Sequence, residues 1–376
     1  MSSSAGDGGI LMTMHRLSQG GADRVAVLLA NGFVQKGIPT RFVLLRDQGE
    51  AERELLDLLH PDVSITSAGP AIGSRHLELV RGQRFIQREI VSHRPAVVLA
   101  SSSNMGLVTG LASKVRRDNG PRFAMKLTNP VVRPRDRGAL RTLYRHKLYA
   151  FIFNQYDLVL TLSEAERLSL LEIYPAAGAL FRTVPNPYIS SEMLQDPPRR
   201  RPAGPCRVLT AARMMPQKRL DVLLQAFART SLPDSRLTIL GDGPLRPALE
   251  RLAQSLGIAD RVEMPGFVDD VLPWLRRTDL FALSSDYEGL PAVILEAFAC
   301  NVPVVTTDCF AGARQMFSEI ASCAVTPVGD PAAFAAAIDR CLTSARKPED
   351  LRKIAEGFGI EASIAAHIRA LDHLMR

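Results

Sequence analysis

Short apolar segments of strand length alternate with longer segments of helical period along this chain, and the alternation runs twice. Such alternation is typical of βα units and predicts a parallel sheet in each half. The first half offers strand candidates at residues 10–15, 40–45, 63–67, 96–100, 123–127 and 158–162. The second half offers them at residues 207–211, 236–240, 262–264, 280–283 and 304–306. The expected fold class is therefore α/β, with two domains of similar type.

A change of composition separates the two halves. Five prolines and three consecutive arginines lie between residues 186 and 205, which is typical of a linker. We therefore predict an N-terminal domain at residues 1–188, a linker at 189–205 and a C-terminal domain at 206–359, because 376 residues suffice for two cores. A final helix at residues 360–376 has no strand after it. It either closes the second domain or crosses back over the first.

Bulk composition narrows the class of protein. Hydrophobic residues make up 46% and charged residues 23%, as in soluble globular proteins. A formal charge of +7 permits anionic partners such as nucleotides, whereas one Trp and six Tyr give no signature of nucleic-acid binding. The first residues lead us to expect no secretory leader, and the sequence has no apolar run of about 18 residues and no C-x-x-C pair. We therefore expect a cytoplasmic chain with free thiols.

Two acids eight residues apart mark the segment with the most chemistry. Glu288 follows a strand candidate, and Glu296 lies inside an apolar helix candidate, since Pro291 fits the first turn of a helix. A carboxylate in such a helix needs hydrogen-bond donors or a raised pKa. We interpret the pair as a binding site for sugar hydroxyls. The alternative is that Glu288 is exposed on the surface and Glu296 forms an ion pair in the core.

Three further features follow predicted strands, which is where open α/β sheets bind ligands. Arg213 and Lys218 share one loop and together can neutralise a diphosphate. Gly243 belongs to a Gly-Asp-Gly-Pro turn, whose glycines allow a ligand close to the backbone. Phe267 follows the strand at 262–264, with a ring and amides that can meet a planar base. Taken singly, each feature also fits a solvated surface or an ordinary turn.

The order of these motifs resembles the retaining GT-B glycosyltransferases of family 4. The motifs are Arg213-x4-Lys218, Gly-Asp-Gly243-Pro, Pro-Gly-Phe267-Val-x-Asp and Glu288-Gly-Leu-Pro-x4-Glu296. In the first half, Gln19-Gly20-Gly21 looks like the N-terminal glycine loop of that family, and Asn186-Pro187 looks like its interdomain junction. The resemblance implies two Rossmann-like domains whose parallel sheets face a central cleft. The first would bind the acceptor and the second the nucleotide sugar.

The resemblance also implies roles for individual residues. Arg213 and Lys218 would hold the donor diphosphate and stabilise the leaving group, while Glu288 would accept hydrogen bonds from the transferred sugar. The other donor-binding residues would be Gly20, Gly21, Gly243, Phe267, Gly289, Leu290 and Glu296. The donor would be a UDP- or GDP-sugar and the acceptor a glycan or lipid-linked intermediate of bacterial polysaccharide synthesis. Neither a metal ion nor another cofactor would be required.

The first half departs from the family at one point. Many relatives carry a His after the fourth strand, where this chain has Ser-Ser-Ser-Asn104-Met. Asn104 is equally a candidate for a sugar contact and for a helix N-cap. His15 and Asn129 are further candidates for sugar or acceptor contacts. For His15, packing of the ring on a neighbouring residue is the safer interpretation.

A basic run in the first half lies within an amphipathic segment. Such a run is usually a solvated helix face, but it also fits an anionic membrane, where each basic residue contributes about 1 kcal/mol. We favour a peripheral position on the inner face of the cell membrane. The residues expected to contact lipid are Arg133, Arg137, Arg141, Arg145 and Lys147.

Other functions are weighed against glycosyl transfer. A GT-B nucleotide-sugar epimerase would need catalytic acids and histidines from both domains, and only His15 offers itself. A dinucleotide-dependent oxidoreductase would need the G-x-G-x-x-G spacing that Gly20-Gly21 lacks. A sugar-nucleotide binding module without turnover stays open, because the first-domain His is missing.

Overall fold

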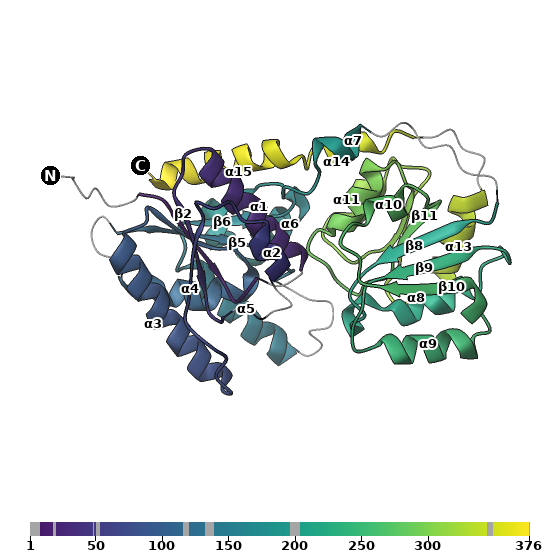
Figure 1. Ribbon diagram of the computed structural model, residues 1–376, viewed down its shortest axis with the longest axis horizontal. Coiled ribbons are helices and arrows are strands. Elements are labelled where there is room, and N and C mark those ends of the chain that lie inside the picture. Colours follow the sequence, from purple (N-terminus) through teal and green to yellow (C-terminus); the bar gives the residue numbers. More distant parts are fainter. Residues whose placement is uncertain are drawn as a thin grey trace. The chain divides into compact units, whose positions relative to one another are not determined.

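A computed structural model describes residues 8–17, 20–47, 49, 53–115, 120–131, 139–195, 204–343 and 349–375. The chain forms two compact units (Figure 1). The first comprises Met1–Pro187 with Ile360–Arg376, and the second comprises Tyr188–Gly359. Each unit has its own parallel sheet, and the units are described in turn.

The sheet of the first unit has the strand order β3-β2-β1-β4-β5-β6-β7, with parallel pairing throughout. Its strands are β1 (Ile10–Met14), β2 (Thr40–Leu44), β3 (Ser64–Ser67), β4 (Val97–Ala100), β5 (Arg122–Lys126), β6 (Leu158–Thr161) and β7 (Phe181–Thr183). The order reverses between β1 and β4. Open α/β sheets bind ligands at the carboxyl ends of strands at such a reversal.

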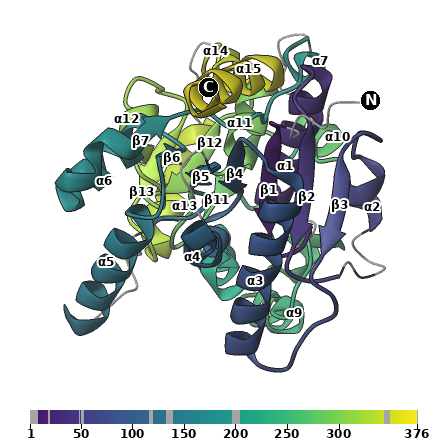
Figure 2. The same ribbon diagram turned by 90° about the vertical axis from the view of Figure 1, so that its left-hand side faces the viewer.

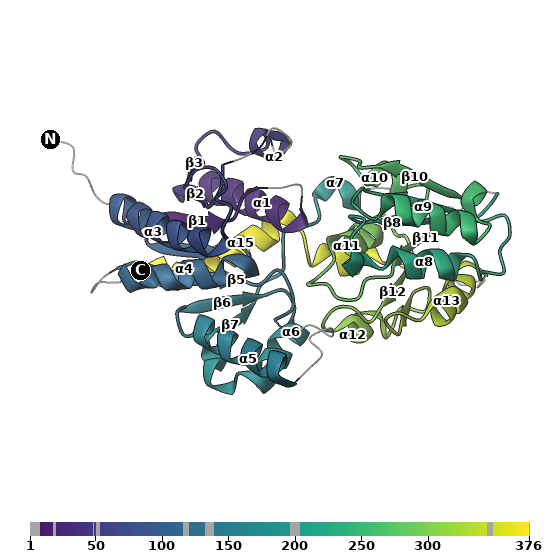
Figure 3. The same ribbon diagram turned by 90° about the horizontal axis from the view of Figure 1, so that it is seen from below.

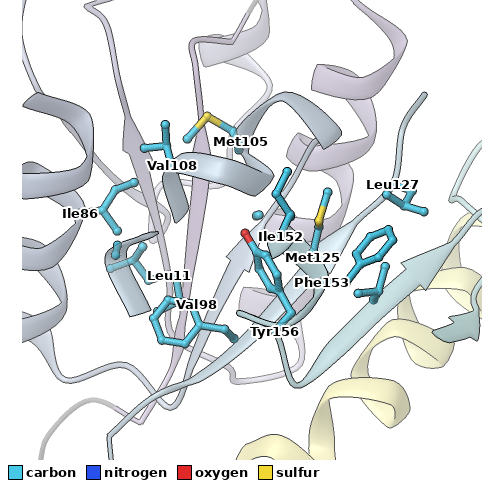
Figure 4. Packing of buried hydrophobic residues seen from close by; sticks show 14 of the residues in the cluster. Leu11, Ile86, Val98, Met105, Val108, Met125, Leu127, Ile152, Phe153 and Tyr156 are labelled. Carbon is cyan, nitrogen blue, oxygen red and sulfur yellow. The ribbon is translucent and has the colours of Figure 1, made fainter. Parts of the chain in front are cut away.

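Helices cover both faces of this first sheet (Figure 2). They are α1 (Gly21–Gln35), α2 (Arg53–Asp57), α3 (Arg75–His93), α4 (Gly106–Ala112), α5 (Ala139–Phe153), α6 (Glu164–Ile173) and α15 (Ile360–Met375). Beneath α3, α4 and α5, strand residues such as Leu11, Val98 and Met125 meet Val108 and Ile152 of the helices (Figure 4). The strand residues between them face the opposite side, because successive side chains of a strand alternate.

The C-terminal helix α15 belongs to the first unit. It packs against α1, β4 and β5. A Cβ added to Gly32 of α1 would come within 2.4 Å of Ile364 of α15, so the glycine permits this close approach. Of the two alternatives left by the sequence, the helix therefore crosses back to the first domain.

Two neighbouring segments carry the chain between the units. The amides of Tyr188 and Ile189 both donate to the carbonyl of Phe358 at 3.0 Å. After them, α7 (Ser191–Leu194) buries Met193 beside helix α11 (Ala292–Ala299). Residues 188–195 thus belong to the second unit, and the predicted linker at 189–205 begins too early. The prolines of this segment indicated a linker, although Ile189 and Met193 are buried. Residues 196–203 of that linker lie outside the described residues.

The sheet of the second unit has the order β10-β9-β8-β11-β12-β13, again with parallel neighbours. Its strands are β8 (Arg207–Ala211), β9 (Arg236–Leu240), β10 (Val262–Gly266), β11 (Leu280–Leu283), β12 (Val304–Thr307) and β13 (Ala324–Thr326). One face lies under α8 (Leu220–Phe227), α9 (Arg246–Ser255) and α13 (Pro331–Thr343) (Figure 3). The remaining helices are α10 (Leu272–Leu275), α11, α12 (Ala313–Phe317) and α14 (Arg352–Glu356). The order reverses between β8 and β11.

Candidate active site

The loops that follow β8 and β11 meet at the reversal of the second sheet. The first loop runs through a short 3-10 helix, Pro216–Lys218, and the second covers residues 284–291. Gln217 ties them together, because its carbonyl accepts from the amide of Asp286 at 2.8 Å and its side-chain amide donates to the carbonyl of Tyr287 at 2.6 Å. Strand order thereby brings the Lys218 loop onto the Glu288 loop.

Lys218 and Glu288 form an ion pair at this junction. The Lys218 Nζ donates to Glu288 Oε1 at 2.6 Å, and the Ser285 hydroxyl donates to the same oxygen at 2.6 Å. Glu288 is buried at 9% exposure, so the alternative of a surface-exposed acid is wrong. A carboxylate with two donors in a partly water-excluded setting is held in a fixed orientation. This fixed orientation of the Glu288 carboxylate is suited to binding a polar ligand.

The backbone around the ion pair is fixed by neighbouring hydroxyls. The Ser284 hydroxyl donates to the carbonyls of Lys218 at 2.9 Å and Arg219 at 3.0 Å. The Thr307 hydroxyl, from the end of β12, donates to the carbonyl of Ser285 at 2.6 Å. Residues at or after the ends of the three neighbouring strands β8, β11 and β12 therefore position the pair together.

Cys309 is buried next to Glu288. Its carbonyl accepts from the amide of Glu288 at 2.6 Å. Burial, with a smaller effect from the Glu288 charge, raises the pKa of the Cys309 thiol to about 12, so it stays protonated at neutral pH. Within the described ranges, no three His, Cys, Asp or Glu side chains are grouped so that they would hold a metal ion.

Arg213 shares the loop of Lys218 but stands apart from the ion pair. Its side chain is exposed, and among the described residues no hydrogen bond joins it to Lys218 or Glu288. The loop is anchored next to it, since the amide of Met214 donates to the carbonyl of Asp242 at 2.8 Å. The guanidinium therefore faces solvent from a fixed backbone.

Gly243 makes that anchoring possible. A Cβ at Gly243 would come within 2.7 Å of the Met214 carbonyl oxygen and 2.9 Å of its amide nitrogen. Gly241 adopts φ of +111°, which side chains rarely allow. The turn after β9 thus positions the loop of Arg213, which agrees with the alternative that Gly243 has a structural role in a turn.

Phe267 follows β10 at the same edge of the sheet, and its side chain is 52% exposed. The carbonyl of the preceding Gly266 accepts from the amide of Gly241 at 2.7 Å, which joins this loop to the glycine turn. The loops after four neighbouring strands are therefore linked along one edge. An exposed aromatic ring at its end can contact a flat, apolar ligand group.

The second acid lies deeper than the first. Helix α11 begins at Ala292 with Pro291 as its N-cap, one residue earlier than the predicted first-turn position. Glu296 is 8% exposed within this helix. Between the acids, Gly289 is half-buried and Leu290 is buried, its carbonyl accepting from the Tyr188 hydroxyl at 3.2 Å.

The glycine loop of the first unit leads into α1. Gly20 is the N-cap of that helix and Gly21 its first residue, and the Gly20 carbonyl accepts from the amides of Asp23 and Arg24 at 3.0 Å. The amides at a helix N-terminus favour anions. Gln19 lies outside the described residues.

The other first-unit candidates follow β1, β4 and β5. Asn104 is exposed within a 3-10 turn, Ser103–Met105, whose N-cap is Ser102, so the N-cap interpretation of Asn104 is wrong. Ser103 has the structural role instead, because its hydroxyl accepts from the amides of Thr128 at 2.9 Å and Asn129 at 3.3 Å. His15 lies next to β1 and lines a cavity described below.

The basic helix α5 presents only part of the predicted lipid-binding set. Arg141 and Lys147 are exposed. Arg145 is half-buried and donates to the carbonyls of Val131 and Pro130. Its position on α5 turns the guanidinium toward the body of the unit. Arg133 and Arg137 lie outside the described residues. In the part of the chain that the structure describes, no helix is long and apolar enough to span a bilayer.

Two family models match the chain. The model described as Glycosyltransferase Family 4 matches residues 19–190, and that described as Glycosyl transferases group 1 matches residues 205–344. The chain belongs to the family 4 glycosyltransferases. The two matches correspond to the two units, so this glycosyltransferase carries the family pattern in both.

Curated relatives of this glycosyltransferase match it over part of their length. It is 37% identical over 139 residues to the lipopolysaccharide core biosynthesis glycosyltransferase LpsE of Rhizobium meliloti, which covers 37% of this chain and 40% of LpsE. It is 33% identical over 112 residues to the N-acetylgalactosamine-N,N'-diacetylbacillosaminyl-diphospho-undecaprenol 4-alpha-N-acetylgalactosaminyltransferase of Campylobacter jejuni, covering 30% of each chain. Less than half the length of these relatives is matched.

A solved structure matches nearly the whole chain. The HepE protein of Anabaena, solved in complex with UDP and glucose, is 18% identical with a TM-score of 0.78, covering 97% of this chain and 99% of HepE. At this identity the likeness concerns the fold. Together with the two parallel sheets, it confirms the predicted GT-B fold class of the glycosyltransferase.

Sequence reasoning missed several residues that position the candidate site. Ser284 and Ser285 fix the Lys218–Glu288 pair, and the only signal was that the apolar strand breaks into small polar residues before the acid. The ion pair between Arg46 and the buried Glu78 in the first unit had no sequence motif.

Proposed function

We propose that the protein transfers a hexosyl group from a UDP- or GDP-sugar to a glycan or lipid-linked acceptor in bacterial polysaccharide or lipopolysaccharide synthesis. The observation that carries the proposal is the convergence of Lys218 and Glu288 at the reversal of the second sheet. The names of the relatives support the pathway class, and the UDP and glucose bound to HepE support the donor class.

The proposed reaction retains the anomeric configuration. The bond from the anomeric carbon to the diphosphate oxygen breaks, and its electron pair goes to the diphosphate. The acceptor hydroxyl oxygen bonds to the same face of the sugar, and its proton passes to the departing phosphate oxygen. Positive charge from Lys218 and Arg213 stabilises the leaving diphosphate, because it is placed where negative charge develops. These two cations support a reaction that requires no metal ion.

Donor binding would rearrange the ion pair. Lys218 would turn to the diphosphate, which leaves Glu288 Oε1 to accept hydrogen bonds from the sugar hydroxyls. Gly289 and Leu290 would place their amides near the phosphates, Glu296 would bind the ribose hydroxyls and Phe267 would meet the base. In the first unit, Gly20 and Gly21 would add amides to the diphosphate site, while His15, Asn104 and Asn129 are proposed contacts for the sugar or acceptor.

A donor panel tests this function. Incubation with UDP- and GDP-hexoses, without acceptor and with EDTA present, should release the nucleoside diphosphate and free sugar slowly for at least one donor. The anomeric form of the released sugar, read early by NMR, should match that of the donor. Release of a changed hexose from the same donor would instead support the epimerase. Nucleotide binding without hydrolysis would support a binding module, and the absence of both would exclude the donor site.

We further propose that α5 binds an anionic membrane surface on the cytoplasmic side. Leu140, Tyr144, Lys147 and Phe151 follow each other at helical spacing, so they share one outer face of the helix. Leu140 is 84% exposed and Tyr144 70%. A row of exposed apolar side chains with basic neighbours is typical of a helix lying in a membrane interface.

Vesicle sedimentation checks the membrane proposal. The protein should bind vesicles containing 30% anionic lipid (a chosen composition, about one lipid in three) more strongly than neutral vesicles. Replacing both Leu140 and Tyr144 with Ser should weaken binding about tenfold or more, since their apolar surface no longer enters the interface. Leu168→Ser, which alters an exposed apolar residue on α6, is the control and should bind as the parent does. Equal binding to neutral and anionic vesicles would contradict the proposal.

A further inference from the structure

The first unit contains an open cavity of about 580 Å³ at the carboxyl edge of its sheet. Its lining includes His15 after β1, Arg46 after β2 and Glu78 of α3, and the side chains of Arg46 and Glu78 contact each other. The loop residues Ala71, Ile72 and Gly73, between β3 and α3, complete the lining. The amide of Arg46 donates to the carbonyl of His15 at 3.1 Å, so two neighbouring strands position these side chains.

Among the described residues, every hydrogen bond to the Glu78 carboxylate goes to Oε1. Arg46 donates to Oε1 through Nε at 2.9 Å and Nη2 at 2.6 Å, and the amide of Ile72 donates to it at 3.0 Å. Glu78 is 7% exposed. The hydrogen bond from Arg46, more than any other interaction, holds the pKa of Glu78 below its usual value, so the acid is ionised at neutral pH.

The other oxygen of Glu78 remains available to a ligand. No described residue donates a hydrogen bond to Oε2, and this oxygen is not among the buried atoms without a partner, so solvent reaches it. Arg46 uses Nε and Nη2 for Glu78, and no described residue accepts from its Nη1. The cavity therefore presents one strong acceptor and one strong donor, held next to each other.

We propose that this cavity binds a neutral sugar ring of the acceptor through two neighbouring hydroxyls. One hydroxyl would donate to Glu78 Oε2, and the other would accept from Arg46 Nη1. A fixed carboxylate that faces the ligand disfavours phosphate and uronate groups, because a second negative charge would approach within a few ångströms. The assignment of this sugar to the acceptor rests on the proposed transferase function, whereas sugar binding by the cavity does not.

Saturation-transfer NMR with methyl α-D-glucopyranoside, galactopyranoside and mannopyranoside tests the inference directly. At least one of the three should bind the intact protein, and Glu78→Gln should weaken its binding about 10- to 100-fold, the range for a lost hydrogen bond to a charged group. Glu89→Gln is a matched control, since Glu89 is also a buried acid of α3 but lies outside the cavity lining. It should bind the glycoside as the parent does.

A second variant tests the inference independently, in case Glu78→Gln does not fold. Gly73 lines the cavity, and a Cβ added there meets no atom within 4 Å. Gly73→Leu should therefore fold normally, as judged by circular dichroism and melting temperature, and fill the space meant for the sugar. Loss of glycoside binding in this variant supports the inference, and unchanged binding overturns it.

Charged probes decide which ligand class the cavity selects. Methyl α-D-glucuronide and glucose 6-phosphate should bind the parent at least tenfold more weakly than the best neutral glycoside. Stronger binding of either anion, or no binding of any neutral glycoside at 20 mM (a chosen ceiling, of the order expected for one weakly held sugar ring), would overturn the inference. The glycoside-binding experiments contain no nucleotide, so they do not depend on donor hydrolysis. If the protein binds a glycoside but hydrolyses no donor, the proposed transferase function is rejected and the sugar-binding cavity is not.

Discussion

Lys218→Ala should lower donor turnover about 100- to 1,000-fold, the usual cost of removing one group that stabilises charge in a transition state. The ammonium lies 2.6 Å from Glu288 at the sheet reversal, where the leaving diphosphate is proposed to lie. The measurement is the initial rate of nucleoside diphosphate release from the donor identified in the panel. Lys353→Ala removes an exposed lysine of α14 in the same unit and should leave the rate unchanged.

Glu288→Gln separates the role of the acid from that of its partner. The amide keeps the shape but loses the charge, so turnover should fall about tenfold or more while Trp274 fluorescence still reports a folded second unit. If the two residues act as a unit, the double variant Lys218→Ala/Glu288→Gln should be about as slow as the slower single variant. A double variant with parental activity would rule out this site.

A pH-dependent stability of the first unit is the second large effect that we expect. Lys126, at the end of β5, is 1% exposed, and its Nζ lies 2.9 Å from Nε2 of His367 on α15. The other ring nitrogen of His367 lies 2.8 Å from the Ser363 carbonyl, so it carries the proton, and Nε2 accepts from Lys126. The nearby Glu166 is also buried, and its Oε2 accepts from the amide of Leu162 at 2.8 Å.

The sign of the effect follows from the pKa of each group. Burial lowers the pKa of Lys126 from its usual 10.5 to about 7, so from pH 7 upward only the unfolded chain keeps this proton and stability rises with pH. Burial raises the pKa of Glu166 to about 7 and lowers that of His367 well below 6.5. Below pH 7 those two groups act in opposite directions, whereas above it Lys126 dominates.

Between pH 7 and about 9 the unfolding free energy of the first unit should therefore rise by at most ~1.4 kcal/mol per pH unit. Hydrogen exchange of amides in β5 and α15, corrected for intrinsic rates, measures it, and amides of β8 and β9 serve as an internal reference. Lys126→Met should remove this slope. Lys147→Met, which replaces an exposed lysine of the same unit, should keep it. A slope that survives in Lys126→Met would contradict the assignment.

Local pattern predicted most of the fold. The strands predicted from apolar segments and the final helix at 360–375 lie within one or two residues of their predicted positions. Strands β7 (Phe181–Thr183) and β13 (Ala324–Thr326) were missed, because three residues are too few to show a period. The start of the second unit was misplaced because prolines obscured the burial of Ile189 and Met193.

The sequence by itself determined the two-domain α/β class and which loops carry polar residues, since those depend on period and composition near each residue. Only the tertiary structure decided which loops meet. Lys218 pairs with Glu288 across 70 residues because β8 lies beside β11, and Lys126 meets His367 across 241 residues because α15 returns to the first sheet. Strand order and chain crossing depend on packing between distant segments. Local periodicity in the sequence therefore does not predict strand order or chain crossing.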